Sequence, residues 1–212
     1  RSLYQTAFAW DHRPAFVLIT GDLVHEGTSA DYARAKTLLQ ELDEQYHTKT
    51  YPALGNHDIR KNFNSAFRGL ASDQPLDYCV QTEWLRWIVL DSSCGQVIGK
   101  LSGSQLAWLE QELCKPTDSP TILALHHPVY GTTTAETDAN NLATPDRLIR
   151  LLQDHPVDGI LCGHSHEATL VTEQGLPPQF VGAGAASAAL PLIQGRVQFR
   201  KQCWIQFCRV QD

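Results

Sequence analysis

The chain has 212 residues, of which 42% are hydrophobic and 19% are charged, and this composition excludes an intrinsically disordered protein. Its 17 Lys and Arg residues against 23 Asp and Glu residues give a net charge of −6, which argues against binding to a nucleic-acid polymer or to a membrane surface, because both favour a basic face. No apolar run approaches the roughly 20 residues that span a bilayer. We therefore expect one soluble domain, residues 1–212.

The first half of the chain alternates short apolar strands with amphipathic helices. Residues 15–20 form a continuous apolar run, which is typical of a strand buried on both faces. The polar run at 28–31 precedes apolar positions three and four residues apart, which predicts a helix to about residue 45. Further strands are predicted at residues 50–54, 76–81 and 84–91.

The second half continues this pattern and ends in strands. Ser102, with Gln105 three residues later, predicts the start of a helix that ends before Pro116. Thr144-Pro145 predicts the start of another helix. Strands are predicted at residues 121–125, 157–162, 168–172, 179–182 and, with an interruption, 196–210. The order of elements predicts an α/β fold with a mixed sheet.

The cysteines bear on the cellular compartment. The chain has six, without the Cys-x-x-Cys spacing of many metal and redox sites. In a chain of this size we expect reduced, packed thiols, which favours a cytoplasmic location.

Four predicted strands end in side chains that can bind metal ions. The motifs are Gly21-Asp22, Gly55-Asn56-His57-Asp58, His126-His127-Pro128 and Gly163-His164-Ser165-His166. Because ligands collect at the carboxyl ends of strands in open α/β sheets, these loops are expected to converge. Carboxylate, amide and imidazole groups together suit Mn, Fe, Zn or Co, so the sequence predicts a metal site.

Each motif also has a purely structural interpretation. A Gly-Asp pair after a strand is most often a turn, and His126 and His127 could be hydrogen-bonded neighbours at a sheet edge. The Asn-His-Asp sequence, however, offers nothing to an apolar core, and residues two apart such as His164 and His166 share one face of an extended segment. All four motifs together favour the metal site.

Several other conspicuous side chains lack such a motif. Surface or capping positions are expected for His12, His25, His47 and His155. Packing positions in the core are expected for Trp84, Trp87 and Trp108. Asp91, at another strand end, is either a supporting group of the site or a turn residue.

In this order, the four motifs resemble those of the calcineurin-like metallophosphoesterases. Flanking sequences such as Tyr-Pro-Ala-Leu-Gly-Asn-His-Asp and Leu-Cys-Gly-His-Ser-His look most like the bacterial class III 3′,5′-cyclic nucleotide phosphodiesterases. The similarity runs from about residue 13 to about residue 184. It implies a four-layer αββα sandwich with two mixed β-sheets, and hydrolysis of a small-molecule phosphodiester, cAMP first among the candidates.

The resemblance also implies a binuclear metal centre. Asp22 would bridge the two metal ions, and His166 would bind the first of them. The ligands of the second metal ion would be completed by Asn56, His126 and His164. His126 is preferred to His127 because the family places Pro two residues after its ligand, as Pro128 is placed here.

The implied chemistry is direct attack by a hydroxide that bridges the metals. Two cations about 3.5–4 Å apart can clamp a phosphodiester and lower the pKa of the bridging water. Asn56 and His57 would contact the substrate, His57 would stabilise or protonate the leaving oxygen, and Asp58 would orient His57.

One departure from the family pattern concerns the start of the chain. The family opens with Asp-x-His at the end of its first strand, whereas here the adjacent Asp11 and His12 precede the strand at 15–20. Residues 1–10 resemble the tail of the helix that follows the missing motif, so the first strand is expected to be absent. A parent protein is expected to be a competent enzyme, and this chain alone to be inactive with only Asp22 and His166 for its first metal.

Other functions stay open at this point. The substrate could be a glycerophosphodiester, a lipid pyrophosphate or a phosphomonoester, because recognition would lie in loops such as residues 59–70 and 130–143. A function from a different class is a non-catalytic scaffold with a degraded metal site. Homo-oligomerisation is left open. The residues that follow Gly184 are loosely similar to the family, whereas residues 201–212 have no family counterpart and are expected to form a final strand.

Overall fold

The computed structural model describes residues 1–9, 13–131, 141–166, 168–182, 194–198 and 204–208. Its helices are α1 (Ser2–Phe8), α2 (Ser29–Tyr46), α3 (Arg60–Phe63), the π-helix η1 (Asn64–Arg68), α4 (Gly103–Leu113) and α6 (Asp146–Asp154). Its strands are β1 (Val17–Thr20), β2 (Thr50–Ala53), β3 (Tyr78–Gln81), β4 (Arg86–Val89), β5 (Thr121–Ala124), β6 (Gly159–Cys162), β7 (Thr169–Val171), β8 (Gln179–Val181), β9 (Gln194–Gln198) and β10 (Trp204–Cys208).

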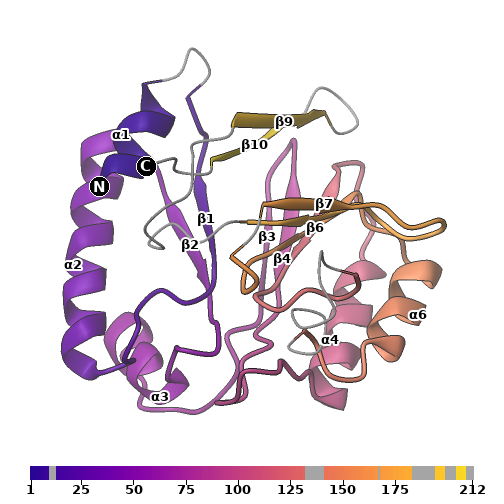
Figure 1. Ribbon diagram of the computed structural model, residues 1–212, viewed down its shortest axis with the longest axis horizontal. Coiled ribbons are helices and arrows are strands. Elements are labelled where there is room, and N and C mark those ends of the chain that lie inside the picture. The colour runs from indigo at the N-terminus through magenta and orange to yellow at the C-terminus, as the bar shows by residue number, and fades with distance from the viewer. Residues whose placement is uncertain (10–12, 132–140, 167, 183–193, 199–203, 209–212) are drawn as a thin grey trace.

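The strands are arranged in layers between helices. β1 and β2 pair in parallel, and a six-stranded mixed sheet has the order β3-β4-β5-β6-β8-β7. β9 and β10 pair antiparallel with each other. Figure 1 shows α1 and α2 outside the β1–β2 pair, and α4 and α6 on the opposite side of the molecule, beyond the larger sheet. This confirms the predicted four-layer αββα fold, with a parallel pair of strands in the smaller sheet.

Both long helices begin where the sequence predicted. The Thr28 hydroxyl accepts a hydrogen bond from the backbone N–H of Asp31, and Ser102 does the same for Gln105. In each case the third helical side chain bonds back to the cap, which satisfies backbone groups that the first turn leaves without helical partners. The helix predicted at Thr144-Pro145 begins at Asp146, with Pro145 as its cap.

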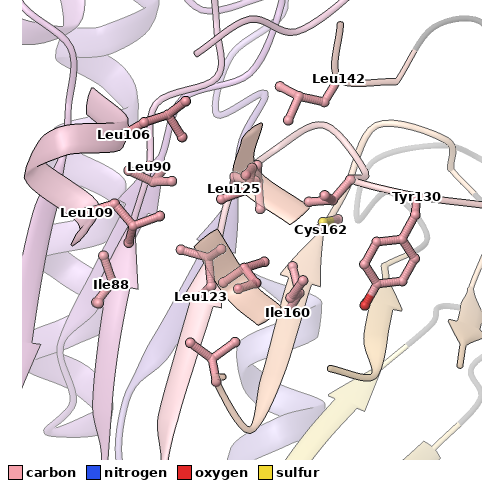
Figure 2. Close-up of a cluster of buried hydrophobic side chains, with 14 of the residues drawn as sticks. Ile88, Leu90, Leu106, Leu109, Leu123, Leu125, Tyr130, Leu142, Ile160 and Cys162 are labelled. Atoms are coloured by element: carbon pink, nitrogen blue, oxygen red, sulfur yellow. The ribbon is translucent and has the colours of Figure 1, made fainter. Parts of the chain in front are cut away.

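Side chains that alternate between the two faces of the larger sheet divide the core into two apolar layers. Ile88, Leu123 and Ile160 face the helices, where they pack with side chains such as Leu109 (Figure 2). Their neighbours along the strands face the β1–β2 pair instead, and the buried members of that second cluster include Trp87, Val89, Ile122, Ala124 and Ala53. Successive residues of a strand point to opposite faces, so the continuous apolar runs are explained by burial on both sides.

The segment 59–70 departs from the sequence prediction, which treated it as a loop. It contains α3 and η1, and it is anchored by Phe63, which is 1% exposed and packs with Tyr32 and Leu54. The buried Asn64 amide donates hydrogen bonds to the backbone carbonyls of Ser72 and Gln74. These contacts leave less of the segment available for substrate recognition than expected.

Two further predictions meet different outcomes. Trp87 is buried as predicted and Trp108 is partly buried, but Trp84 is 44% exposed and its predicted core position is wrong. Trp84 precedes β4 in a turn in which the Thr82 hydroxyl accepts from the Leu85 N–H, so its side chain does not follow the alternation of the strand. The predicted positions of Asp11 and His12, and most of the loop 130–143, lie outside the described residues.

Within the described part of the chain, none of the helices combines the length and the apolar character needed to cross a membrane.

Candidate metal centre

The polar motifs lie at the carboxyl ends of strands from both sheets. Asp22 follows β1, Asn56 follows β2, His126 follows β5 and His164 follows β6. Asn56 Oδ1 is 3.0 Å from His126 Nε2 and 3.0 Å from His164 Nδ1. His126 Nε2 is also 3.2 Å from His164 Nδ1 and 3.4 Å from Asp22 Oδ2. The fold therefore brings these side chains into one cluster, although they come from four separate loops.

Two glycines and two residues with a left-handed backbone conformation allow these loops to approach one another closely. A Cβ on Gly55 would collide with the Asp22 carboxylate, and a Cβ on Gly21 would collide with the His126 ring. Asp22 and His164 have φ values of 53° and 72°, in the left-handed region that non-glycine residues seldom adopt. Such strain persists where the surrounding structure requires it, often at functional sites.

The hydrogen bonds of His126 determine which of its nitrogen atoms faces the cluster. His126 Nδ1 is 2.8 Å from the Thr20 carbonyl oxygen, which can only accept, so Nδ1 carries a proton. Nε2 is the ring nitrogen that faces Asn56 Oδ1 and an oxygen of Asp22. Together these oxygen and nitrogen atoms form a donor set that suits a divalent transition metal.

The charge of Asp22 fits the same conclusion. Burial by itself raises the pKa of its carboxyl group, but the contact with His126 and the backbone N–H of His57, which donates to Oδ1 at 3.0 Å, outweigh burial. The pKa of Asp22 is lowered to about 2, so the carboxylate is ionised and can bind a cation at neutral pH.

His127 lies beside the cluster but is engaged elsewhere. The rings of His126, His127 and His164 bring nitrogen atoms within 4.8 Å of one another. His127 Nε2, however, lies 3.0 Å from the Val97 carbonyl oxygen, and its Nδ1 lies 2.8 Å from the Ser92 hydroxyl. Burial, together with the neighbouring histidines, lowers the pKa of His127 to about 3, so its ring is neutral. Both of its nitrogens therefore have partners, and of this pair it is His126 that faces Asn56.

Asp58 occupies a different position from the one expected. One of its oxygens accepts hydrogen bonds from the backbone N–H groups of Gly55 and Leu23, and the other accepts from the Tyr32 hydroxyl. Burial raises the pKa of Asp58 despite these hydrogen bonds. Among the described residues, the expected contact of Asp58 with the ring of His57 is not found. Both oxygens of Asp58 bind other groups instead, and they hold the backbone of the loop.

The ring of His57 is held by His25, which sequence reasoning had placed at the surface without a role. His57 Nδ1 lies 3.1 Å from the His25 carbonyl oxygen, and the two rings stack with centroids 4.7 Å apart. No motif surrounds His25, so only its position three residues after Asp22 hinted at this contact.

Tyr32 is a second residue whose role the sequence did not disclose. Its hydroxyl donates to Asp58 and accepts from the Ile59 backbone N–H at 2.8 Å, while its ring is fully buried. Tyr32 is one of the apolar positions whose spacing of three and four residues predicted the helix α2. The signal that could have found it is its hydroxyl, because a buried tyrosine generally has a polar partner.

Two remaining candidates lie apart from the cluster. His166 is exposed, with φ of 58°, and no contact joins it to the cluster within the described residues. Asp91 is fully buried and accepts hydrogen bonds from Arg60 Nε at 2.7 Å and from the Leu76 N–H at 3.0 Å. Of the two roles left open for Asp91, the turn is supported, because its Oδ1 accepts from the Ser93 N–H two residues further on at 2.9 Å, while its Oδ2 links α3 to the end of β4.

Comparison of the sequence with known proteins identifies the family of this chain. The sequence model of the family described as calcineurin-like phosphoesterase matches residues 3–168. A probable cyclic nucleotide phosphodiesterase of Rhodococcus erythropolis is 37% identical over 167 residues, covering 78% of this chain and 56% of the relative. The glycerophosphodiester phosphodiesterase GpdQ of Enterobacter lignolyticus is 32% identical over 168 residues, covering 74% of this chain and 58% of that protein. The chain thus spans less than three fifths of the length of these two relatives.

Among solved structures, the fold resembles that of a dimetal phosphatase from Danio rerio. The TM-score is 0.67 at 16% sequence identity, and the superposition covers 86% of this chain and 76% of the other. At this identity the likeness concerns the fold alone.

Proposed function

Because the chain belongs to the calcineurin-like phosphoesterase family, whose members use divalent metals, we propose that the protein that carries it is a metal-dependent phosphodiester hydrolase. The observation that carries the proposal is the convergence of Asp22, Asn56, His126 and His164, whose oxygen and nitrogen atoms face one another at the strand ends. A carboxylate, an amide oxygen and imidazoles gathered at one point form the ligand types that divalent metals prefer.

The cluster would hold the metal through Asp22, Asn56, His126 and His164. In the binuclear arrangement that we propose, Asp22 would be shared and His166 would belong to the other metal. When bound, the metals would neutralise phosphate charge and supply an activated water. The Thr20 carbonyl supports this arrangement, because it keeps the proton of His126 on Nδ1 and so leaves Nε2 to bind.

The remaining groups of the site would act on the substrate. His57 is exposed beside the cluster, and its backbone N–H is tied to Asp22. Its ring would donate a proton to the leaving oxygen of a phosphodiester. Asp58 and Tyr32 would keep the loop of Asn56 and His57 in place.

The proposed substrate is a small 3′,5′-cyclic nucleotide such as cAMP, with no nucleic-acid polymer or membrane as partner. The Rhodococcus relative and the net charge of −6 support this choice. A glycerophosphodiester is the second candidate, because the Enterobacter relative acts on that class by name. We also propose a cytoplasmic location, which is supported by the free thiols of Cys79, Cys94, Cys114 and Cys162 in the described residues.

The test is hydrolysis by the full-length gene product. Cyclic AMP, a glycerophosphodiester, bis-p-nitrophenyl phosphate and p-nitrophenyl phosphate are supplied with and without Mn²⁺. An Asn56→Ala variant is measured beside the parent protein, with His155→Ala as the matched control. We expect metal-dependent diester hydrolysis that falls by at least about 100-fold in Asn56→Ala and is unchanged in His155→Ala.

The relative rates on the four substrates separate the candidates. A higher kcat/KM for cyclic AMP than for the glycerophosphodiester supports the first substrate class, and the reverse supports the second. No hydrolysis of any substrate by a folded, metal-loaded protein would favour the non-catalytic scaffold.

A further inference from the structure

The loop after β4, residues 92–99, contacts the metal centre through the ring of His127. The centroid of this ring lies 4.8 Å from that of His126 and 4.6 Å from that of His164. Nε2 of the same ring lies 3.0 Å from the Val97 carbonyl oxygen. A single side chain therefore joins the loop to two of the proposed metal ligands.

Both the base and the tip of this loop are held in place. At the base, the Ser92 hydroxyl lies 2.8 Å from His127 Nδ1. A Cβ on Gly99 would collide with the His127 ring, so the chain passes close to the histidine there as well. At the tip, the Cys94 thiol donates to the Ile98 carbonyl oxygen at 3.2 Å. A loop held in this way can bind a ligand without a large cost of ordering.

The tip of the loop presents two large apolar side chains to solvent. Val97 is 53% exposed, and the adjacent Ile98 is 40% exposed. Ile59, on the loop after β2, is 46% exposed, and the next residue, Arg60, donates to the backbone carbonyl of Ser93, which joins the two loops. Single exposed apolar side chains are common, but neighbouring ones beside a polar site are typical of ligand-binding surfaces.

The chemical character of the loop restricts its ligand. None of the residues 92–99 is charged, so the loop offers no ion-pair partner to a charged head group such as that of glycerophosphoethanolamine. Apolar side chains instead suit the face of an uncharged nucleobase. The exposed Gln96 adds an amide, which can accept from N6 and donate to N7 of adenine at the same time. Guanine presents two acceptors at the corresponding positions and does not match this amide.

We propose that residues 94–98 are the base-recognition loop of the site and select an adenine nucleotide, which rests on the proposed phosphodiesterase function. Val97 and Ile98 cover the face of the base, and the Gln96 amide pairs with N6 and N7 of adenine. The cyclic phosphate of the same molecule lies at the metal centre. The loop thus favours cyclic AMP over cyclic GMP through its amide, and over a glycerophosphodiester through its apolar side chains.

Removal of the apolar side chains tests the first of these contacts. In the full-length protein with Mn²⁺, we expect the double variant Val97→Ser, Ile98→Ser to raise KM for cyclic AMP by about 10-fold with little change in kcat. Both constants for glycerophosphoethanolamine should be unchanged, because that substrate has no base. Leu170→Ser is the matched control, since Leu170 on β7 is also 53% exposed, and it should affect neither substrate.

Removal of the amide tests the second contact. Gln96→Ala should lower the preference for cyclic AMP over cyclic GMP, measured as the ratio of their kcat/KM values, by about 10-fold. Gln111→Ala, at an exposed position of α4, should leave this ratio unchanged. An unchanged ratio in Gln96→Ala, or equal losses on cyclic AMP and glycerophosphoethanolamine in the double variant, would overturn the proposal.

Binding of adenosine measures the same contacts without catalysis. Saturation-transfer NMR on the metal-free protein should show transfer to the protons of the adenine base, and at least about 5-fold less transfer in the double variant. No transfer in the parent protein, or equal transfer in the variant, would contradict the base-recognition loop even if phosphodiesterase activity is found. Conversely, an inactive protein that binds adenosine through this loop would refute the proposed function but not the loop.

Discussion

The candidate metal centre and the apolar layer beneath α4 and α6 share strands β5 and β6 but differ in how their atoms are satisfied. In the middle of these strands, Leu123 and Ile160 are fully buried among other apolar side chains (Figure 2). A few residues further along, His126 and His164 place polar ring atoms against each other and against Asn56, and His164 has a positive φ. The same strand thus stabilises the fold in its middle and holds reactive groups at its carboxyl end.

The largest expected effect lies in the apolar layer. Leu123→Ala removes a fully buried side chain and leaves a cavity that the sheet cannot close. We expect the free energy of unfolding to fall by about 2–5 kcal/mol, measured by chemical denaturation of the metal-free protein. A loss below about 1 kcal/mol would show that this layer is less tightly packed than its burial indicates.

The opposite behaviour is expected in the cluster. Asn56→Ala removes an amide placed for metal binding at a backbone loop and not for packing, so the stability of the metal-free protein should change little or rise. The stabilisation by Mn²⁺, about 2.7 kcal/mol at a concentration 100 times the Kd, should largely disappear. Thermal unfolding with and without Mn²⁺ measures both effects. An undiminished shift with Mn²⁺ would remove Asn56 from the ligand set.

Gly55→Ala tests the close packing of the chain within the metal centre. The new Cβ would collide with the Asp22 carboxylate, so we expect a loss of about 1–3 kcal/mol in the free energy of unfolding together with weaker Mn²⁺ binding. Calorimetric titration with Mn²⁺ and a denaturation curve measure the two quantities. A variant with normal stability and normal Mn²⁺ affinity would contradict the close approach of β2 to Asp22.

The smallest effect is expected at Tyr32, which packs in a separate cluster with Leu54 and Phe63 and binds Asp58 through its hydroxyl. Tyr32→Phe keeps the buried ring but removes the hydroxyl that joins Asp58 to the Ile59 N–H. The free energy of unfolding should fall by about 1–2 kcal/mol, because buried hydrogen-bonding groups lose a partner. Denaturation of the variant beside the more severe Tyr32→Ala separates the hydroxyl from the ring, and equal losses in the two variants would assign the whole effect to the hydroxyl.

Much of the fold could be predicted from local patterns. The strand at Val17–Thr20 and the helix at Ser29–Tyr46 follow from a continuous apolar run and from a capped 3.6-residue period. The helical segment from Arg60 to Arg68 could not, because it depends on tertiary contacts of Phe63 and Asn64. Local propensity gives way there to packing.

For the candidate site, the sequence located the loops but not the contacts within them. That Asp22 and His126 would meet could be argued from the ends of parallel strands. The pairing of His57 with the His25 carbonyl could not, because a backbone acceptor leaves no mark on the sequence. The same holds for Asp58, whose partners are mainly backbone N–H groups.

The residues of the cluster are far apart in the sequence, and this affects when the metal can bind during synthesis of the chain. His126 meets Asn56 across 70 positions and Thr20 across 106, and His164 meets Asn56 across 108. Contacts of such sequence separation form late in folding, because long loops must close first. A nascent chain still on the ribosome, with only β1 and β2 outside, therefore has no complete set of ligands. Capture of the metal would mark the end of folding and would not precede it.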